Sequence, residues 1–100
     1  MEDLPTFAQR MREAREAIGI SQKQLGILAG IDPSGASARI NQYERGKHFP
    51  DQLTAQRLAT VLNVPVSFLY EPDDQLAGLI RQLGRLMPVE RQRLSDALKQ

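Results

Sequence analysis

Apolar side chains recur every three or four positions along most of this chain, the spacing that places them on one face of an α-helix. Nowhere do polar and apolar residues alternate with the period of two that is typical of half-buried strands. The sequence therefore predicts an all-α fold. The predicted helices occupy residues 6–18, 21–29, 33–45, 52–62 and 66–69, followed by two more within 73–99.

The starts of the first two helices carry a particular polar pattern. Thr6 is followed three residues later by Gln9, and Ser21 by Gln24, so each pair can form a capping box in which both side chains bond to backbone amides. Gly30 follows the second helix and favours its end. These signals predict two short helices in succession. In the same way, Asp51 is placed to cap the helix over residues 52–62.

The apolar stripes predict the core. Across residues 6–69 the inward positions are Phe7, Met11, Ala14, Ile18, Leu25, Leu28, Ala29, Ile40, Tyr43, Ala55, Leu58, Ala59, Leu62, Val66 and Leu69. The last two helices form a predicted hairpin whose inward positions are Leu76, Leu79, Ile80, Leu83, Leu86, Val89, Leu94, Ala97 and Leu98. Two short helices cannot bury both stripes against each other alone. The hairpin is therefore expected either to cover the domain or, as we favour, to pair with a second copy.

The start of the third helix is open to two interpretations. Asp32-Pro33 is a strong start signal, because a carboxylate can cap a helix and proline fits its first position. We therefore favour a helix over residues 33–45. In the alternative, a longer loop precedes a helix whose true cap is Ala36 or Ser37.

The composition limits the size of the domain and the kinds of binding site that the chain can form. The 100 residues, 41% of them hydrophobic, suit one compact domain with a small appendage. The formal net charge of +1 does not by itself indicate nucleic acid, so any such function must rest on local placement. The absence of cysteine and the single histidine leave almost nothing for a metal site, and we expect no cofactor.

Nothing in the sequence predicts a membrane segment or export. No apolar run approaches the length of a membrane span, and the first residues, MEDLPTF, lack a basic and then apolar signal pattern. A cysteine-free composition also fits a reducing compartment. We therefore expect a cytoplasmic protein that does not bind a membrane.

A set of matched positions resembles a known family. Two short helices joined by a glycine-ended turn are typical of a helix-turn-helix unit. Residues 6–70 resemble the lambda-repressor-like, or XRE, family of bacterial and phage DNA-binding regulators. The matching positions are Arg15, Gln22, Gly26, Gly30, Ile40, Tyr43 and the exit signature Glu44-Arg45-Gly46.

The resemblance implies a five-helix DNA-binding domain over residues 1–70, followed by the two-helix hairpin within 71–100. It implies that Gly26 lies where the two motif helices approach too closely for a larger side chain. It also implies a structural ion pair between Arg15 and Glu44, which would fix the first helix against the third, the recognition helix.

The chain departs from the family just before the recognition helix. The family has about five steps between the apolar positions matched by Ile31 and Ile40, whereas here there are nine. Four extra residues amount to about one turn and rotate a helix by about 400° in place of 360°, so the phase of Ile40 is nearly conserved. On the favoured interpretation, the helix carries an additional first turn of small residues that can lie close to phosphates or groove walls.

Side-chain chemistry assigns roles to the polar face of that helix. Gln42 can offer a donor and an acceptor to adenine, and Arg39 can reach guanine or a phosphate. Ala38 can meet a thymine methyl group, while Ser37 and Asn41 lie on or near the same face. These five residues are the predicted base contacts.

A second group of polar residues is placed to contact phosphates. Gln22 stands at the start of the second helix, Ser34 in the favoured first turn of the third, and Lys47 and His48 just beyond its end. Basic residues outnumber acidic ones between Arg39 and His48, which the modest net charge conceals.

Together these features predict a sequence-specific transcriptional regulator, a repressor, that inserts the helix around residues 33–45 into the major groove of double-stranded DNA. We expect a homodimer that binds an inverted repeat with half-sites about 34 Å apart or a multiple of that spacing. The alternative is a helical protein-interaction adaptor or antitoxin in which DNA contact is secondary or absent. An enzyme is not expected, because no nucleophile, base and orienting group occur together.

Overall fold

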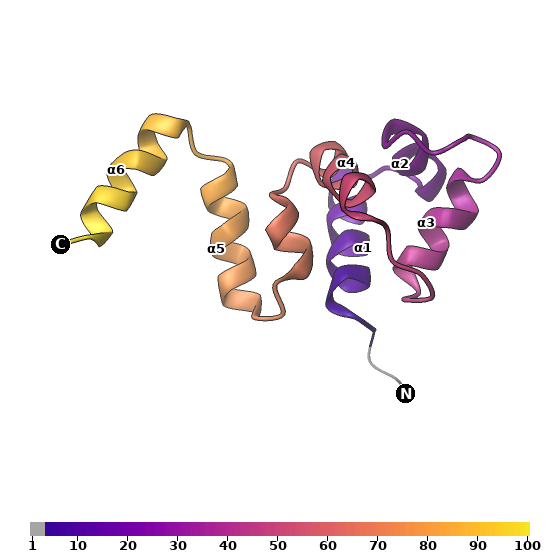
Figure 1. Ribbon diagram of the computed structural model, residues 1–100, viewed down its shortest axis with the longest axis horizontal. Coiled ribbons are helices and arrows are strands. Elements are labelled where there is room, and N and C mark those ends of the chain that lie inside the picture. The colour runs from indigo at the N-terminus through magenta and orange to yellow at the C-terminus, as the bar shows by residue number, and fades with distance from the viewer. Residues whose placement is uncertain (1–3) are drawn as a thin grey trace.

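The regular structure of residues 4–100, the part that the computed structural model describes, is entirely helical, as predicted (Figure 1). The first three residues of the predicted domain 1–70 lie outside this part. In chain order the helices are α1 (Thr6–Ile18), α2 (Gln22–Leu28), α3 (Ala36–Glu44), α4 (Gln52–Leu62), the 3-10 helix η1 (Val66–Tyr70), α5 (Asp74–Gly84) and α6 (Pro88–Leu98).

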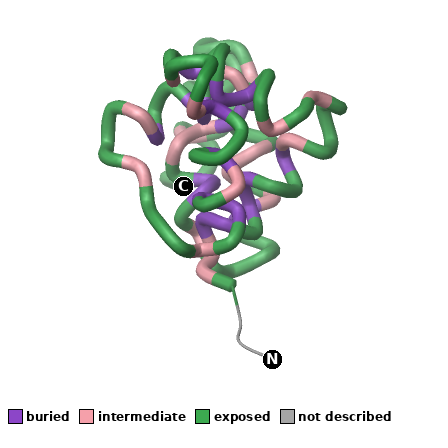
Figure 2. Tube along the Cα trace, turned by 90° about the vertical axis from the view of Figure 1, so that its right-hand side faces the viewer, coloured by how far each residue is buried: buried purple, intermediate pink, exposed green. Residues whose placement is uncertain are grey.

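The first five elements enclose one core around α1. This helix packs against α3, α4 and η1, while α2 packs against α3 and α4. Most of the predicted core positions are confirmed, and the largest fully buried ones are Met11, Leu25, Ile40, Leu58, Leu62 and Leu69. Figure 2 shows these buried stretches inside a largely exposed outer layer of chain. Burial of each such side chain contributes about 1.5–3 kcal/mol.

Two of the cap predictions are confirmed. The Ser21 hydroxyl accepts from the backbone amide of Gln24 at 3.0 Å, and the Gln24 side chain accepts from the Ser21 amide at 2.8 Å. This capping box starts α2. The Asp51 carboxylate accepts from the Thr54 amide at 2.8 Å and starts α4. Both helices thus begin where local side-chain chemistry predicts.

The capping box predicted for α1 is wrong. Pro5, not Thr6, is the N-cap residue, and its extended backbone leads the chain into the helix one residue earlier. Thr6 is therefore already helical and its hydroxyl does not cap. The Gln9 side chain donates instead to the Leu4 carbonyl at 2.6 Å.

The favoured start of the third helix is also wrong. α3 begins at Ala36 with Gly35 as its N-cap residue, so the longer loop is present and the additional first turn is not. Asp32 and Pro33 begin a turn, closed by a hydrogen bond from the Gly35 amide to the Asp32 carbonyl at 3.0 Å. Aspartate, proline and glycine at these positions are equally the preferred residues of a type I turn. The four extra residues thus lengthen the α2–α3 loop rather than the helix.

Ile18 and Leu28 are exposed, so these two core predictions are wrong. Ile18, the last residue of α1, is 43% exposed, and Leu28 is 64% exposed. In α2 and its C-cap the buried residues are Leu25, Gly26 and Ala29. Each helical residue turns by about 100°, which places Leu28 about 60° from Leu25, on the side away from Gly26 and Ala29.

The last two helices extend away from the core, as Figure 1 shows. α5 packs on η1 by one edge only: Ala77 is buried, Ile80 is partly buried, and Gly84 lies so close to Pro65 that an added Cβ would be 2.5 Å from its Cγ. Among the described residues, α6 has none that is buried.

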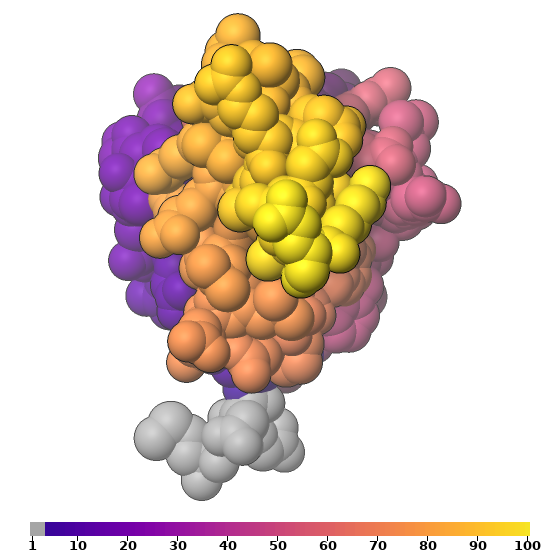
Figure 3. All heavy atoms as spheres, turned by 90° about the vertical axis from the view of Figure 1, so that its left-hand side faces the viewer, coloured from indigo at the N-terminus to yellow at the C-terminus, as the bar shows by residue number. Residues whose placement is uncertain are grey.

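Most of the inward positions predicted for α5 and α6 are therefore wrong within the single chain. The exposed large apolar side chains of this region are Leu76, Leu79, Leu83, Met87, Val89, Leu94 and Leu98. Seen from the left-hand end of the molecule, α5 and α6 form the surface nearest the viewer (Figure 3). Within residues 4–100, no helix is both long and apolar enough to cross a membrane.

Candidate nucleic-acid interface

The α3 helix has a buried side and an exposed polar side. Ile40 and Tyr43 are buried in the core and fix the helix against α1. Asn41 is half-buried at the boundary between the two sides. The exposed side carries four of the five predicted base contacts, Ser37, Ala38, Arg39 and Gln42. This helix therefore presents hydrogen-bonding groups outward from a fixed support.

A glycine permits α2 and α3 to approach closely. A Cβ added to Gly26 would lie 2.8 Å from the Cβ of Ala36 and 3.0 Å from its carbonyl oxygen. Both residues are buried. No side chain larger than hydrogen fits at Gly26 without movement of the first turn of α3.

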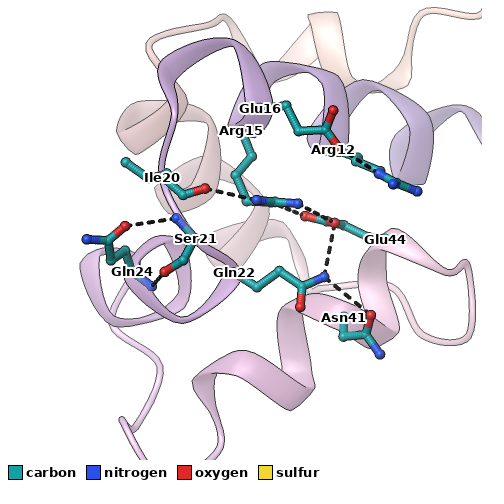
Figure 4. A network of polar contacts seen from close by, with 9 residues as sticks. All are labelled: Arg12, Arg15, Glu16, Ile20, Ser21, Gln22, Gln24, Asn41 and Glu44. Atoms are coloured by element: carbon teal, nitrogen blue, oxygen red, sulfur yellow. Dashed lines mark hydrogen bonds and ion pairs between the residues drawn. The ribbon is translucent and has the colours of Figure 1, made fainter.

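A bidentate ion pair joins α1 to the C-terminal end of α3 (Figure 4). Arg15 donates to both carboxylate oxygens of Glu44, from Nε at 2.6 Å and from Nη2 at 3.0 Å. Its Nη1 also donates to the Ile20 carbonyl at 2.9 Å. The bond to Glu44 raises the pKa of Arg15 above its usual value. With the Glu44 side chain 4% exposed, the pair holds α3 in one orientation.

Gln22 and Asn41 belong to the same network, as Figure 4 shows. The Gln22 Nε2 group donates to Glu44 at 3.1 Å and to the Asn41 side-chain oxygen at 3.3 Å. Gln22, a predicted phosphate contact, and Asn41, a predicted base contact, are thus hydrogen-bonded to each other. Both side chains are partly exposed and remain at the surface between α2 and α3.

The loop after α3 is attached to the end of that helix. Gly46 has a left-handed backbone (φ +70°), which ends the helix. The amides of Lys47 and His48 donate to the Gln42 carbonyl at 2.9 and 3.4 Å. The side chains of Lys47 and His48 are exposed. Two predicted phosphate contacts therefore follow directly from the exposed side of α3.

Ser34 lies in the α2–α3 loop rather than in a helix. Its hydroxyl donates to the Asp32 carboxylate at 2.6 Å, and its amide donates to the same oxygen at 2.9 Å. These bonds, the hydroxyl bond most of all, hold the pKa of Asp32 below its usual value. The expected place of Ser34 in a first helical turn is wrong, although its side chain is exposed.

Comparison with known proteins agrees with this geometry. A helix-turn-helix family profile matches residues 11–69, which include most of α1, all of α2, α3 and α4, and the segment between α2 and α3. The chain belongs to the XRE-type helix-turn-helix family. α2 and α3 are the two helices of its motif, and α3 is the recognition helix.

Curated relatives match the helix-turn-helix part of the chain. An uncharacterized HTH-type transcriptional regulator of Sinorhizobium medicae is 37% identical over 62 residues, which are 62% of this chain and 42% of that protein. The uncharacterized HTH-type transcriptional regulator RghRB of Bacillus subtilis is 40% identical over 60 residues, 59% of this chain and 40% of that protein. The chain thus spans less than half the length of these relatives.

Two solved structures are also similar. The transcriptional regulator BswR has 46% sequence identity and a TM-score of 0.83, covering 92% of this chain and 91% of that one. The restriction-modification controller protein C.AhdI from Aeromonas hydrophila has 35% identity and a TM-score of 0.57, covering 65% of this chain and 92% of that one. The likeness to BswR extends beyond the helix-turn-helix part.

The structure adds a residue beside the recognition helix that sequence reasoning missed. Phe49 is 58% exposed and lines a surface hollow together with Arg39, Gln42, Tyr43 and His48. The available signal was an aromatic residue directly after the basic residues of the exit loop.

A second hollow lies beside the polar network. Its lining includes Arg12 and Arg45, which were not predicted, together with the network residues Arg15, Gln22, Asn41 and Glu44. Arg12 also pairs with Glu16 at 2.8 Å on the exposed face of α1. The helix-turn-helix surface therefore carries more basic groups than the recognition helix alone supplies.

Sequence reasoning also missed the link between α1 and α5. Arg10, 9% exposed, donates from Nε and Nη2 to the Glu71 carbonyl at 2.9 and 2.7 Å. Its Nη2 lies 3.1 Å from the Asp74 carboxylate, and its guanidinium lies over the Phe68 ring. Position 10 follows Phe7 by three residues, so helical spacing does place it on the buried side. Arg10 thereby fixes the start of α5.

Proposed function

We propose that this protein is a sequence-specific DNA-binding transcriptional regulator that inserts α3 into the major groove. The observation that carries this proposal is that α3 has two different sides. One side is buried in the core, and the other is exposed and polar beside a basic loop. The helix-turn-helix family and the likeness to transcriptional regulators support it. The major groove admits an α-helix of this kind.

The exposed side of α3 supplies the proposed base contacts. Gln42 offers a bidentate donor and acceptor to adenine, and Arg39 reaches guanine or a phosphate. Ser37 and Ala38 lie one turn earlier on the same exposed side. The side-chain oxygen of Asn41 accepts a hydrogen bond from Gln22. The side-chain NH2 group of Asn41 is therefore the group that can donate to a base.

The proposed phosphate contacts flank this helix. Lys47 and His48 follow it, and Gln22 begins α2. Because Gln22 already donates to Glu44, its proposed role includes positioning the recognition helix as well as meeting the backbone. Ser34 can reach a phosphate only from the α2–α3 loop.

We further propose that the protein binds DNA as a homodimer joined through α5 and α6. Eleven-residue helices are marginal in isolation, yet α6 buries nothing within the described chain. Leu83, Leu94 and Leu98 line a mainly apolar groove between the two helices, suited to a second copy of them. Such a dimer would read an inverted repeat with half-sites about 34 Å apart or a multiple, and would repress by occupying the site.

Reversal of one charge tests the proposal against a protein-interaction adaptor. Arg39→Glu replaces an exposed cation with an anion that phosphates repel, so it should abolish retention on DNA. The fold should remain, because Arg39 contributes nothing to the core. An adaptor would keep its binding partner in the variant, and wild-type protein with no affinity for any duplex would refute the DNA-binding role.

A second substitution tests base reading by Gln42. Gln42→Ala should cost about 1–3 kcal/mol at the preferred site and relax discrimination at one base position. The preferred site is obtained by selection from random duplexes, and affinities are then measured on single-base variants. An equal loss on every sequence would show that Gln42 does not read bases.

Lys47→Ala provides the contrasting case. Loss of a phosphate contact should weaken binding to all sequences similarly and reduce the salt slope by about one unit. The measurement is affinity against salt concentration for wild type and variant. A salt slope equal to that of wild type would show that Lys47 does not contact a phosphate.

A further inference from the structure

An exposed aromatic side chain lies beside the recognition helix. Phe49 is 58% exposed and lines a surface hollow together with Arg39, Gln42 and His48, and the buried Tyr43 also contributes to the lining. An aromatic ring left in water is unfavourable, since its burial contributes to stability at about 25 cal/mol per Å². The Phe49 ring thus forms an apolar wall of a small hollow that is otherwise lined mainly by hydrogen-bonding side chains.

The position of Phe49 is tied to the recognition helix. The two preceding residues, Lys47 and His48, donate their amides to the Gln42 carbonyl. Pro50 follows and is half-buried, and Asp51 caps α4. The ring is therefore carried by a short loop anchored at both ends, and any duplex that meets Gln42 also comes near Phe49.

We propose that this hollow receives the C5 methyl group of a thymine in the major groove, with Phe49 as the residue that selects it. This inference rests on the proposed function, because it requires α3 in the groove. Thymine is the only standard DNA base that carries a methyl group on this edge, and apolar contact with that methyl is a known mode of base recognition. Arg39 and Gln42 read polar edges, so Phe49 adds the apolar selection that they lack.

Replacement of thymine by deoxyuracil removes only the methyl group and provides the test. The operator is first selected from random duplexes with the full chain, and each thymine is then replaced in turn by deoxyuracil. For wild type, one thymine position per half-site, apart from any that Ala38 contacts, should lose about fourfold in affinity, the value of one buried methyl group. In Phe49→Ala the same replacement should change nothing, while Phe49→Leu should retain part of the effect.

The matched control is Leu28→Ala, which truncates a comparably exposed apolar side chain on α2, outside the hollow. This variant should keep the full sensitivity to deoxyuracil. If Phe49→Ala weakens every duplex alike and keeps the wild-type response to deoxyuracil, the ring contacts the sugar-phosphate backbone and the inference is overturned. It is also overturned if no thymine position responds in wild type. Failure to select any operator would instead refute the proposed function itself.

Discussion

At the scale of single residues, the orientation of the recognition helix depends on Glu44. Its carboxylate accepts two bonds from Arg15 and one from Gln22, and its side chain is 4% exposed. A buried carboxylate with its partners is tolerated, whereas one stranded without a cation is strongly unfavourable. Gln22 also donates to Asn41, which lies at the edge of the exposed polar side of α3.

Arg15→Met should therefore lower the free energy of unfolding by about 3 kcal/mol, because it leaves the Glu44 charge buried without its ionic partner. Urea unfolding followed by circular dichroism measures the loss. The double variant Arg15→Met, Glu44→Gln should recover part of it, because no charge is then stranded.

The control for this prediction is Arg12→Met. Arg12 also forms an ion pair, with Glu16 at 2.8 Å, but both side chains are more than half exposed. Water screens such a pair, so its loss should be much smaller than that of Arg15. Equal losses for the two variants would mean that burial of Glu44 is not what makes its pair important.

At the scale of elements, the contact between α2 and α3 determines where the recognition helix lies. Gly26 and Ala36 meet with no space for another carbon atom. The α2–α3 loop can carry four additional residues because this contact, and not the loop, positions the first turn of α3. Loop lengthening is otherwise cheap in free energy.

Gly26→Ala should lower the free energy of unfolding by about 1–3 kcal/mol, because the added methyl group overlaps Ala36 at 2.8 Å. Addition of Ala36→Gly should recover much of the loss by removing the opposing carbon. Thermal or urea unfolding tests both variants.

Gly78→Ala is the control for Gly26→Ala, because Gly78 has space for an added methyl group. Gly78 lies within α5 with nothing within 4 Å of an added Cβ. Alanine is the better helix former, so this variant should be neutral or more stable by about 0.5–1 kcal/mol. A destabilised Gly78→Ala together with a neutral Gly26→Ala would contradict the role given to the α2–α3 contact.

The cap of α4 predicts a dependence of stability on pH. The hydrogen bond from the Thr54 amide, at 2.8 Å, holds the pKa of Asp51 below its usual value. A carboxylate with a lowered folded pKa stabilises the protein above its unfolded pKa, about 3.9, and this contribution disappears as pH falls through the folded pKa. Asp51→Asn still caps but does not titrate, so its stability should fall less between pH 5 and pH 3. A variant with the same pH profile as wild type would contradict this account.

At the scale of the whole molecule, the two ends differ in character. The described protein measures 51 × 31 × 24 Å, with the recognition helix toward one end and α5 and α6 toward the other (Figure 1). The exposed leucines of α5 and α6 have no cover within residues 4–100. A second copy joined at this end would leave both recognition helices free to face DNA.

Leu79→Glu and Leu94→Glu should each convert the proposed dimer into a monomer, because a buried carboxylate in an apolar interface is unfavourable. Sedimentation velocity measures the change. Loss of bivalency should also weaken binding to the full operator by about a hundredfold or more. Leu28→Glu, at a comparably exposed apolar position on α2, should remain dimeric. A monomeric wild type, or dimeric α5 and α6 variants, would refute this interface.

Much of the molecule follows from the sequence by itself. Helical spacing predicted the elements and most of the core, and the polar residues Ser21, Gln24 and Asp51 predicted two helix starts. Each of these signals depends only on residues within about one helical turn, although the equally local pair Thr6 and Gln9 did not form its capping box. The resemblance to the family rests on the same local spacing, and that resemblance, not the spacing itself, implied that Gly26 lies in a close contact.

Only the tertiary structure decided where α3 begins, which edges of the apolar stripes are buried, and what surrounds Phe49. Asp32-Pro33 suits a helix start and a turn nearly equally, so packing of Ala36 on Gly26 decides between them. Leu28 has the right spacing for the core, yet it is buried only if a neighbour covers that edge. Local sequence sets what a segment can form, whereas burial depends on partners that are distant in the chain.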